Sequence, residues 1–137
     1  LDGYIKCNPT DFLRLYDTHS AGSFLPSQPG DFVAVLNGKS NLIECKASEK
    51  FKTVVGSRGL LTDNFSDAQV AHMRVWHRAG ANVLVVFLSI ETDLIEIWDG
   101  HYLALRYIVP RAKPTIEGLK ACFPRNRLGD FLINFMR

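Results

Sequence analysis

The chain has 137 residues, of which 47% are hydrophobic and 22% are charged, and its net charge is +2. This balance is typical of a folded domain and excludes a disordered chain. At this length we expect one domain over residues 1–137, with the start at Leu1 suggesting that residues upstream are missing. The weak net charge does not indicate nucleic-acid binding by itself, so such an assignment has to rest on where the charges lie.

Cysteine usage and hydropathy limit the class further. Three cysteines without a CxxC spacing argue against a disulfide framework or a structural zinc site and favour a reducing compartment. The longest apolar run, residues 83–90, has the length of a strand, so we expect no membrane segment. There is no pattern of a signal peptide.

The N-terminal third is predicted to be a short helix followed by a loop. Asn8 and Pro9 form an N-cap and first-turn proline, which predicts a helix over residues 9–17. Residues 18–30 are rich in Ser, Gly and Pro, which is typical of a loop.

Two strands are predicted next, over residues 31–37 and 41–47, joined by a turn at Gly38. The stretch 49–64 carries three basic residues and two glycines, and it is interpreted as a mobile basic loop.

Ser66 is a good N-cap for a helix that runs to Ala79 and is closed by Gly80. Helical spacing places four of its residues on one face, which should meet the sheet: Gln69, His72, Met73 and Trp76. Residues 82–90 form a continuous apolar run, which predicts a buried strand.

Alternating patterns at 93–99 and 101–109 predict two more strands with a turn at Asp99 and Gly100. Pro114 is expected to open another short helix, and the Phe-rich tail from Asp130 a final one. This order predicts an α/β domain in which helices flank a mixed β-sheet.

The stretch GDFVAVLNGKSNLIECKAS, residues 30–48, places charged side chains within core-like strands. Residues two apart in a strand project to one side, so Glu44 and Lys46 point together and Cys45 points away. Asp31 begins the preceding strand and can converge on them. Two carboxylates that hold a divalent metal ion and a lysine that orients water suit phosphodiester hydrolysis.

A structural interpretation of the same residues stays open at this point. Asp31 can cap a turn, and Glu44 and Lys46 can lie on a solvated strand face. Leu42 and Ile43 weigh against it, because they give the strand core character and a buried, unpaired carboxylate is costly.

The pattern PGD, twelve residues, then ECK resembles the PD-(D/E)xK nuclease signature, with Pro29-Gly30-Asp31 in place of adjacent Pro and Asp. The longer series, DFVAVLNGKSNLIECKAS followed by a basic stretch and FSDAQVAHMRVWHRAGANVLVVFLS, resembles RecU-type Holliday-junction resolvases. Stand-alone VRR-NUC nuclease modules are nearly as similar. The resemblance covers residues 29–100 and implies a restriction-endonuclease-like fold and a single nuclease domain.

The resemblance also implies residue roles. Asp31 and Glu44 become metal ligands with the backbone carbonyl of Cys45, Lys46 the catalytic lysine, and Gln69 a catalytic helix residue that reaches back to the site. The implied cofactor is Mg²⁺, with Mn²⁺ as a substitute, and no small-molecule cofactor is expected.

Two departures from the family pattern stand out. Family members carry an acidic residue on an N-terminal helix, for which Asp11 is the candidate here. No insertion between the first strands forms the stalk of RecU-type proteins, which bears on junction specificity more than on nuclease chemistry.

The implied activity is a structure-selective DNA endonuclease that resolves Holliday junctions in DNA recombination and repair. Its partners would be branched or flapped DNA and a second copy of the chain, since a homodimer supplies two equivalent sites. Five residues near the site are candidates for DNA binding, with solvated surface positions as the alternative: His19, Ser48, Lys50, Lys52 and Arg58. The expected location is the cytoplasm of a bacterium, including a phage-encoded protein there, or another reducing compartment that holds DNA.

Two other functions were weighed against this one. A non-catalytic DNA-binding or assembly module with a nuclease-like core is the main alternative, and intact Asp31, Glu44 and Lys46 argue against it. A cysteine-dependent enzyme is disfavoured, because no Cys–His pairing is suggested by the spacing.

Overall fold

The structure is a computed structural model that describes residues 12–14 and 30–136. In these residues the chain forms a six-stranded sheet in the order β1-β2-β3-β4-β5-β6, which is the order of the sequence. The strands are β1 Phe12–Arg14, β2 Phe32–Leu36, β3 Lys39–Ser48, β4 Asn82–Ser89, β5 Leu94–Asp99 and β6 Leu119–Pro124. The helices are α3 Arg58–Asn64, α4 Asp67–Arg78, α5 Gly100–Ile108 and α6 Leu128–Met136, with 3₁₀ turns η1 Ile116–Gly118 and η2 Arg125–Arg127.

The sheet is mixed, because β3 and β4 pair in parallel while the other neighbours are antiparallel. A parallel pair needs a long crossover, and α3 and α4 supply it. The β2–β3 hairpin turns at Asn37 and Gly38, whose φ angles of 53° and 77° fit a tight two-residue turn. That turn fixes the register in which Phe32 lies opposite Ile43.

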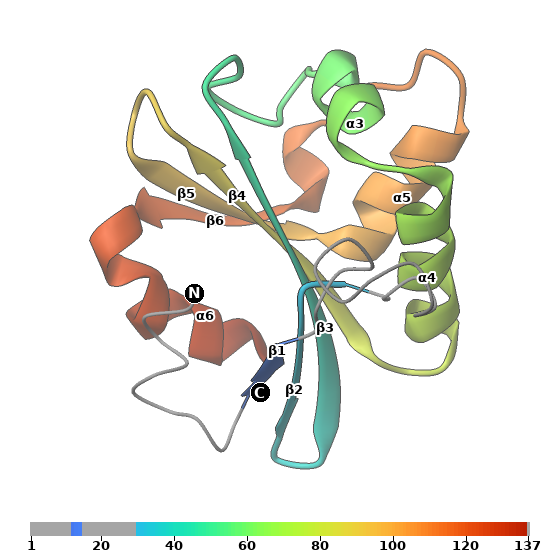
Figure 1. Cartoon of the computed structure of the whole chain (residues 1–137), viewed down its shortest axis with the longest axis vertical. Coiled ribbons are helices and arrows are strands. Elements are labelled where there is room, and N and C mark those ends of the chain that lie inside the picture. Colours follow the sequence, from blue (N-terminus) through green and yellow to red (C-terminus); the bar gives the residue numbers. More distant parts are fainter. Residues whose placement is uncertain (1–11, 15–29, 137) are drawn as a thin grey trace, which may run out of the picture.

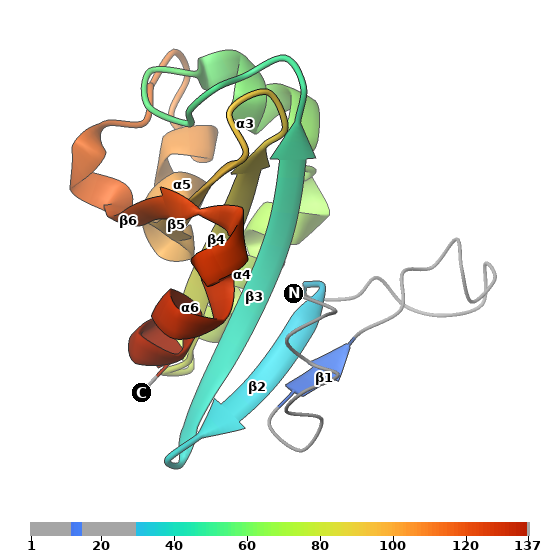
Figure 2. The ribbon, with the colours of Figure 1, turned by 90° about the vertical axis from the view of Figure 1, so that its left-hand side faces the viewer.

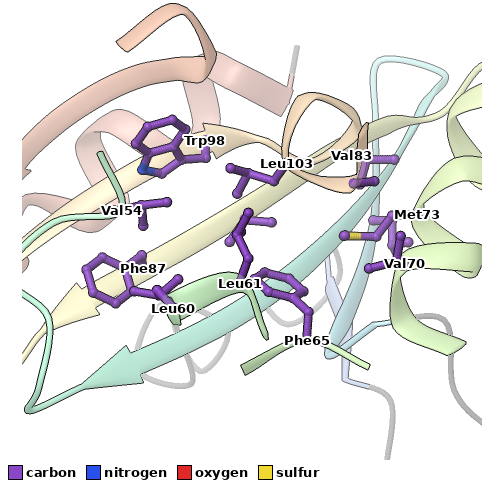
Figure 3. Close-up of a cluster of buried hydrophobic side chains, with 13 residues drawn as sticks. Val54, Leu60, Leu61, Phe65, Val70, Met73, Val83, Phe87, Trp98 and Leu103 are labelled. Carbon is purple, nitrogen blue, oxygen red and sulfur yellow. The ribbon is translucent and has the colours of Figure 1, made fainter. Parts of the chain in front are cut away.

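Helices α3, α4 and α5 cover one face of the sheet (Figure 1). Figure 3 shows how α3 and α4 insert apolar side chains against β4 and β5 there, with Met73 and Leu61 completely covered. The core of this face also includes Leu42, Val85 and Trp98. We call it the α4 face of the sheet.

Helix α6 packs on the opposite face, against Ile43, Val86 and Ile97 (Figure 2). Its C-terminal carbonyls accept hydrogen bonds from two strand side chains: the Asn41 amide donates to Met136 O at 3.2 Å, and the Asn82 amide donates to Phe135 O. We call this the α6 face. The Phe-rich tail therefore completes the core of the monomer.

The predicted α/β class with a mixed sheet flanked by helices is confirmed. Five predicted elements are present as β2, β3, β4, β5 and α6. Helix α4 also begins as predicted, because Ser66 and Gln69 form a complete capping box. Gly80, with φ of 95°, closes it in the left-handed region.

Two predictions about the first half of the chain were wrong. Phe12–Arg14 is a strand that pairs with β2, although residues 9–17 were predicted as a helix, and the rest of that range lies outside the described residues. The stretch 49–64 is not a loop throughout, because α3 occupies Arg58–Asn64. Leu60 and Leu61 bury the helix against the sheet, which explains why it forms.

Two predictions about the second half were also wrong. Residues 101–109 were predicted as a strand, but α5 covers Gly100–Ile108, because the Asp99 carboxylate accepts N–H groups from the first turn and caps it. Pro114 was expected to open a helix, whereas the chain makes the short η1 turn and then β6. Strand β6 was missed altogether. No helix in the described part of the chain is long and apolar enough to cross a bilayer.

Candidate active site

The charged pair of β3 lies on the α4 face. Glu44 and Lys46 project to the same side of the strand, and their side chains are only 3% and 15% exposed. Lys46 Nζ lies 3.3 Å from Glu44 Oε1, so a partly buried ammonium pairs with a buried carboxylate. The structural interpretation of these two residues as solvated decoration is wrong, since both are covered.

Asp31 joins this pair through the hairpin. It stands directly before β2, where its backbone N–H donates to Ile43 O at 3.0 Å. Its carboxylate Oδ2 accepts the backbone N–H of Cys45 at 2.7 Å, next to Glu44. Gly30 permits this approach, because a Cβ there would lie 2.9 Å from Leu42 Cδ1. The sequence predicted that Asp31 converges on the ExK strand, and this contact with Cys45 of β3 confirms it.

Gln69 connects the helix to the two charges. Its Nε2 donates to Glu44 Oε1 at 3.2 Å, and its Oε1 accepts from Lys46 Nζ at 3.3 Å. The same Oε1 accepts the Ser66 backbone N–H at 3.1 Å, while Ser66 Oγ accepts the N–H of Gln69 at 3.2 Å. Two donors on Oε1 fix the orientation of the amide, so that its N–H group faces Glu44.

The surroundings shift the protonation of Glu44. Its pKa is raised from 4.5 to about 7: burial is the largest cause, the charge of Asp31 and a side-chain hydrogen bond with Asp31 also raise the pKa, and Lys46 lowers it. Glu44 therefore has a pKa near 7 and lies beside a second carboxylate. A bound cation would offset the repulsion between the two groups when both are ionised. Such shifts are enriched at functional sites.

The carboxylates fit a divalent metal ion in their chemistry. Lys46 and Gln69 both bond to Oε1 of Glu44, and Cys45 bonds to Oδ2 of Asp31, so these three donors occupy one oxygen of each carboxylate. A proton shared between the carboxyl groups accounts for the hydrogen bond that raises the pKa of Glu44, and a cation can take the place of that proton. Hard cations such as Mg²⁺ prefer these oxygen ligands.

The described residues hold no group of three or more His, Cys, Asp or Glu side chains suited to one metal ion. Asp31 and Glu44 are therefore the side-chain ligands on offer within that part of the chain, and carbonyls, water and substrate phosphate would supply the rest. The backbone carbonyl of Cys45 as a third ligand stays a prediction.

The predicted DNA-binding residues separate into two kinds. Lys50 and Lys52 are exposed, at 73% and 67%, and lie in long ion pairs with Asp63 and Glu91 at 3.4 and 3.5 Å. Exposed pairs of this kind contribute little stability, so both cations can exchange partners. Their assignment to DNA stays a prediction.

Ser48 and Arg58 have structural partners. Ser48 Oγ accepts the backbone N–H groups of Lys50 and Phe51 at 3.0 and 3.1 Å, which shapes the turn after β3. The Arg58 guanidinium donates to the carbonyls of Arg106 and Tyr107, the latter at 2.8 Å, and so satisfies the last turn of α5. His19 and Asp11 lie outside the described residues.

Three contributors escaped the sequence analysis. The Phe65 ring lies 5.0 Å from Lys46 Nζ, and Ser66 orients Gln69. Glu96, only 6% exposed, accepts from Thr53 Oγ1, Val54 N and Trp98 Nε1 at 2.5, 2.9 and 3.0 Å and anchors the segment after β3. The Ser-x-x-Gln capping pattern was visible in the sequence, whereas nothing there identified the partners of Glu96.

No protein-family model and no curated protein matches the chain. Among solved structures it is similar to Hjc, a Holliday junction resolvase from the archaeal hyperthermophile Archaeoglobus fulgidus. The TM-score is 0.46 and the identity 16%, over 74% of this chain and 74% of that one. This likeness concerns the course of the backbone alone.

Proposed function

We propose that this chain is a divalent-metal-dependent endonuclease that hydrolyses phosphodiester bonds in DNA, with Asp31, Glu44, Lys46 and Gln69 as its site. The observation that carries the proposal is the meeting of two carboxylates with a partly buried lysine at the start of β2 and the middle of β3. Mg²⁺ is the cofactor we expect, with Mn²⁺ able to replace it.

A cation held by Asp31 and Glu44 would lower the pKa of a water molecule and offset charge on the scissile phosphate. The chain's own residues would do the positioning. Gln69 holds Glu44 in place through Nε2, and its Oε1 directs the Lys46 ammonium toward the same point. The ammonium can then donate an N–H hydrogen bond to the attacking water or to a phosphate oxygen.

Phe65 contributes to the position of Lys46. Its ring stands 5.0 Å from the ammonium, within the range of a cation–π interaction. Lys46 is thus held by a carboxylate, an amide and a ring. The carboxylate and the amide can accept two of its three N–H donors. This leaves donor capacity for substrate.

Branched or flapped DNA is the substrate class that we propose, in recombination and repair. Support for it comes from the sequence pattern shared with RecU-type resolvases, in which the ExK strand precedes a helix with an inward glutamine. Lys50 and Lys52 flank the site on the exposed segment after β3 and are suited to backbone phosphates.

We also propose a homodimer, because cutting two symmetry-related strands needs two equivalent sites. Since α6 packs on the monomer core, we place the candidate interface at exposed apolar side chains at the end of α5 and beyond: Leu105, Ile108, Val109 and Ile116, exposed by 44%, 45%, 54% and 71%. Sedimentation of the chain with and without junction DNA tests it, and a monomer in both would reject it.

Cleavage assays test the central claim. Labelled four-way junction, flap and linear duplex would be incubated with Mg²⁺, Mn²⁺ or EDTA and with wild type, Asp31→Asn or Lys46→Ala. Asp130→Asn and Lys39→Ala are matched controls at exposed positions. We expect metal-dependent cutting that both site variants abolish and both controls retain.

Each contrary result has a defined meaning. Unchanged cutting by the two site variants would reject the site. Binding without cleavage under any metal condition would favour the alternative function, a non-catalytic DNA-binding or assembly module. Equal cutting of all three substrates would keep the nuclease and reject its selectivity for branched DNA.

A further inference from the structure

A cleft of about 340 Å³ opens on the α6 face beside the candidate site. Its floor is formed by β3 and β4, where Ala47 lies opposite Leu88, and by Ile95 of β5. Figure 2 shows β3 continuing past α6, so the helix covers only part of this face. We call this hollow the Asp31 cleft, because Asp31 forms part of its lining.

The cleft combines apolar walls with a cation. Val86, Leu88, Ile95 and Leu128 make the interior apolar, and Arg125 of η2 stands in the lining with 61% of its side chain exposed. Clefts of roughly 300–1,000 Å³ that are mostly apolar with a few polar groups hold small organic ligands in proteins. An apolar interior with a cation suits a flat ring that carries an anionic group.

Arg125 is held in place at the cleft. Its backbone N–H donates to Asp93 O at 3.1 Å, and its Nε lies 3.1 Å from Asp93 Oδ1. Within the described residues this ion pair engages Nε, which leaves the two Nη groups to meet an anion. The backbone hydrogen bond therefore places Arg125 at the cleft, while the exposed ion pair leaves its guanidinium able to turn toward an anion.

The cleft and the candidate site share residues. Asp31 lines the cleft and also belongs to the carboxylate–lysine cluster, whereas the side chains of Glu44 and Lys46 lie across β3 on the α4 face. A ligand with a phosphate beside Asp31 would place the group attached to that phosphate at the cleft mouth. In DNA this group is a nucleotide with a planar, largely apolar base.

A base in a stacked duplex cannot enter such a cleft, since its faces are covered by neighbouring pairs. We propose that the Asp31 cleft receives one unstacked nucleotide of the DNA substrate, next to the phosphate to be cut, with Arg125 on its backbone. The inference rests on the proposed nuclease function. Extruding a base costs a few kcal/mol and least where pairing is already broken, so the cleft would favour branch points.

Fluorescence of 2-aminopurine tests the inference without catalysis. A flap substrate would carry the analogue at the first unpaired nucleotide of the branch, in EDTA, where the proposed metal-dependent cutting does not proceed. Unstacking raises the emission of this analogue. We expect emission to rise on binding of wild type, and an abasic site at that nucleotide to weaken binding about tenfold.

Variants distinguish binding of a nucleotide in the cleft from general electrostatic attraction between the protein and DNA. Ala47→Trp fills the cleft from an exposed position, so the fold should tolerate it, and thermal unfolding checks this. Arg125→Ala removes the cation. Arg127→Ala is the matched control: it also lies in η2, is 56% exposed and has its own carboxylate partner, Asp130, but it does not line the cleft.

We expect the fluorescence rise and the abasic penalty to disappear in Ala47→Trp, to shrink in Arg125→Ala and to persist in Arg127→Ala. Binding of wild type without any rise in emission overturns the inference, and so do equal losses in Arg125→Ala and Arg127→Ala. The same DNA in Mg²⁺ reports on cleavage separately. Cutting without the emission change rejects the cleft alone, whereas the emission change without cutting supports the cleft and rejects the nuclease.

Discussion

Glu44 and Glu96 are two buried carboxylates on the same α4 face of the sheet, exposed by 3% and 6%. They differ in their neighbours. Glu96 accepts hydrogen bonds from Thr53, Val54 and Trp98, all neutral donors, and ties the segment after β3 to the sheet. Glu44 meets a lysine, an amide and a second carboxylate, that of Asp31.

Burial is thus not what distinguishes a site from an anchor. A buried carboxylate surrounded by donors has its hydrogen-bonding capacity met inside the protein. A buried carboxylate beside another one carries the cost of burial and a repulsion that a proton or a cation removes, and the pKa of Glu44 is raised first by burial and then by the charge of Asp31. The two residues should therefore respond to substitution in opposite ways.

The largest effect is expected from replacing each carboxylate by its amide. Glu44→Gln should lower DNA cleavage by about a thousand-fold or more, because a metal ligand and its charge are lost. In EDTA at pH 8 it should also raise the free energy of unfolding by about 1 kcal/mol or more, because the raised pKa of Glu44 makes the ionised carboxylate unfavourable in the folded chain at that pH. Glu96→Gln should instead cost about 1–3 kcal/mol and leave cleavage nearly unchanged.

Urea unfolding and single-turnover cleavage on the same preparations measure both effects. If Glu96→Gln abolished cleavage while staying folded, the distinction between site and anchor would be lost. If Glu44→Gln were destabilised as strongly as Glu96→Gln, the assigned repulsion with Asp31 would be rejected.

The second prediction concerns pH. Folding raises the pKa of Glu44 from 4.5 to about 7, so between these values the folded chain binds more protons than the unfolded chain. The contribution of Glu44 to stability is therefore present below pH 4.5 and is lost as the pH rises toward 7, by about 3 kcal/mol in total. Mg²⁺ should restore it at high pH, because the cation binds the ionised carboxylate.

Other groups also titrate in this range, so the difference between wild type and Glu44→Gln is the quantity to follow. In EDTA the unfolding free energy of wild type should fall relative to that of the variant between pH 4.5 and 7. A constant difference, or no effect of Mg²⁺ at pH 8, would contradict the assignment.

The local part of the site was predictable from the sequence. Alternation along the strand puts Glu44 and Lys46 on one side whatever the rest of the chain does, and the turn at Gly38 fixes the register that returns Asp31 to them. Gln69 was placed by the family pattern and by the capping signal of Ser66. These features need only neighbours that are close in the sequence or one hairpin away.

The remaining part depended on distant partners. Arg58 was assigned to DNA, but it bonds to carbonyls of α5 that lie 48 and 49 residues away. That helix was predicted as a strand, because the run 101–109 suits both periods, whereas the Asp99 cap and the burial of Leu103 and Ala104 favour the helix. Glu96 was likewise invisible, since its donors Thr53 and Val54 reach it through the tertiary fold.

The third prediction separates capping from positioning around Glu44. Ser66→Ala and Asp99→Ala each remove an N-cap side chain, from α4 and α5, and each should cost about 1 kcal/mol. Only Ser66→Ala should also lower the cleavage rate, by about tenfold, because Gln69 loses part of its support. The kcat should fall with little change in KM, and Ser66→Thr should restore it. Equal activity of the two alanine variants would show that Ser66 only caps the helix.

The smallest effect is expected at the anchor. Thr53→Val removes one donor to Glu96 and keeps the shape of the side chain, while Val54 N and Trp98 Nε1 still bond to the carboxylate. The loss should be about 1 kcal/mol in unfolding free energy, as for a single hydrogen bond, and cleavage should change by less than about twofold. Gln69→Leu, which removes a donor to Glu44 in the same way, is the matched comparison and should reduce cleavage far more. If the two variants affected cleavage alike, the donors around Glu44 would serve the fold just as those around Glu96 do.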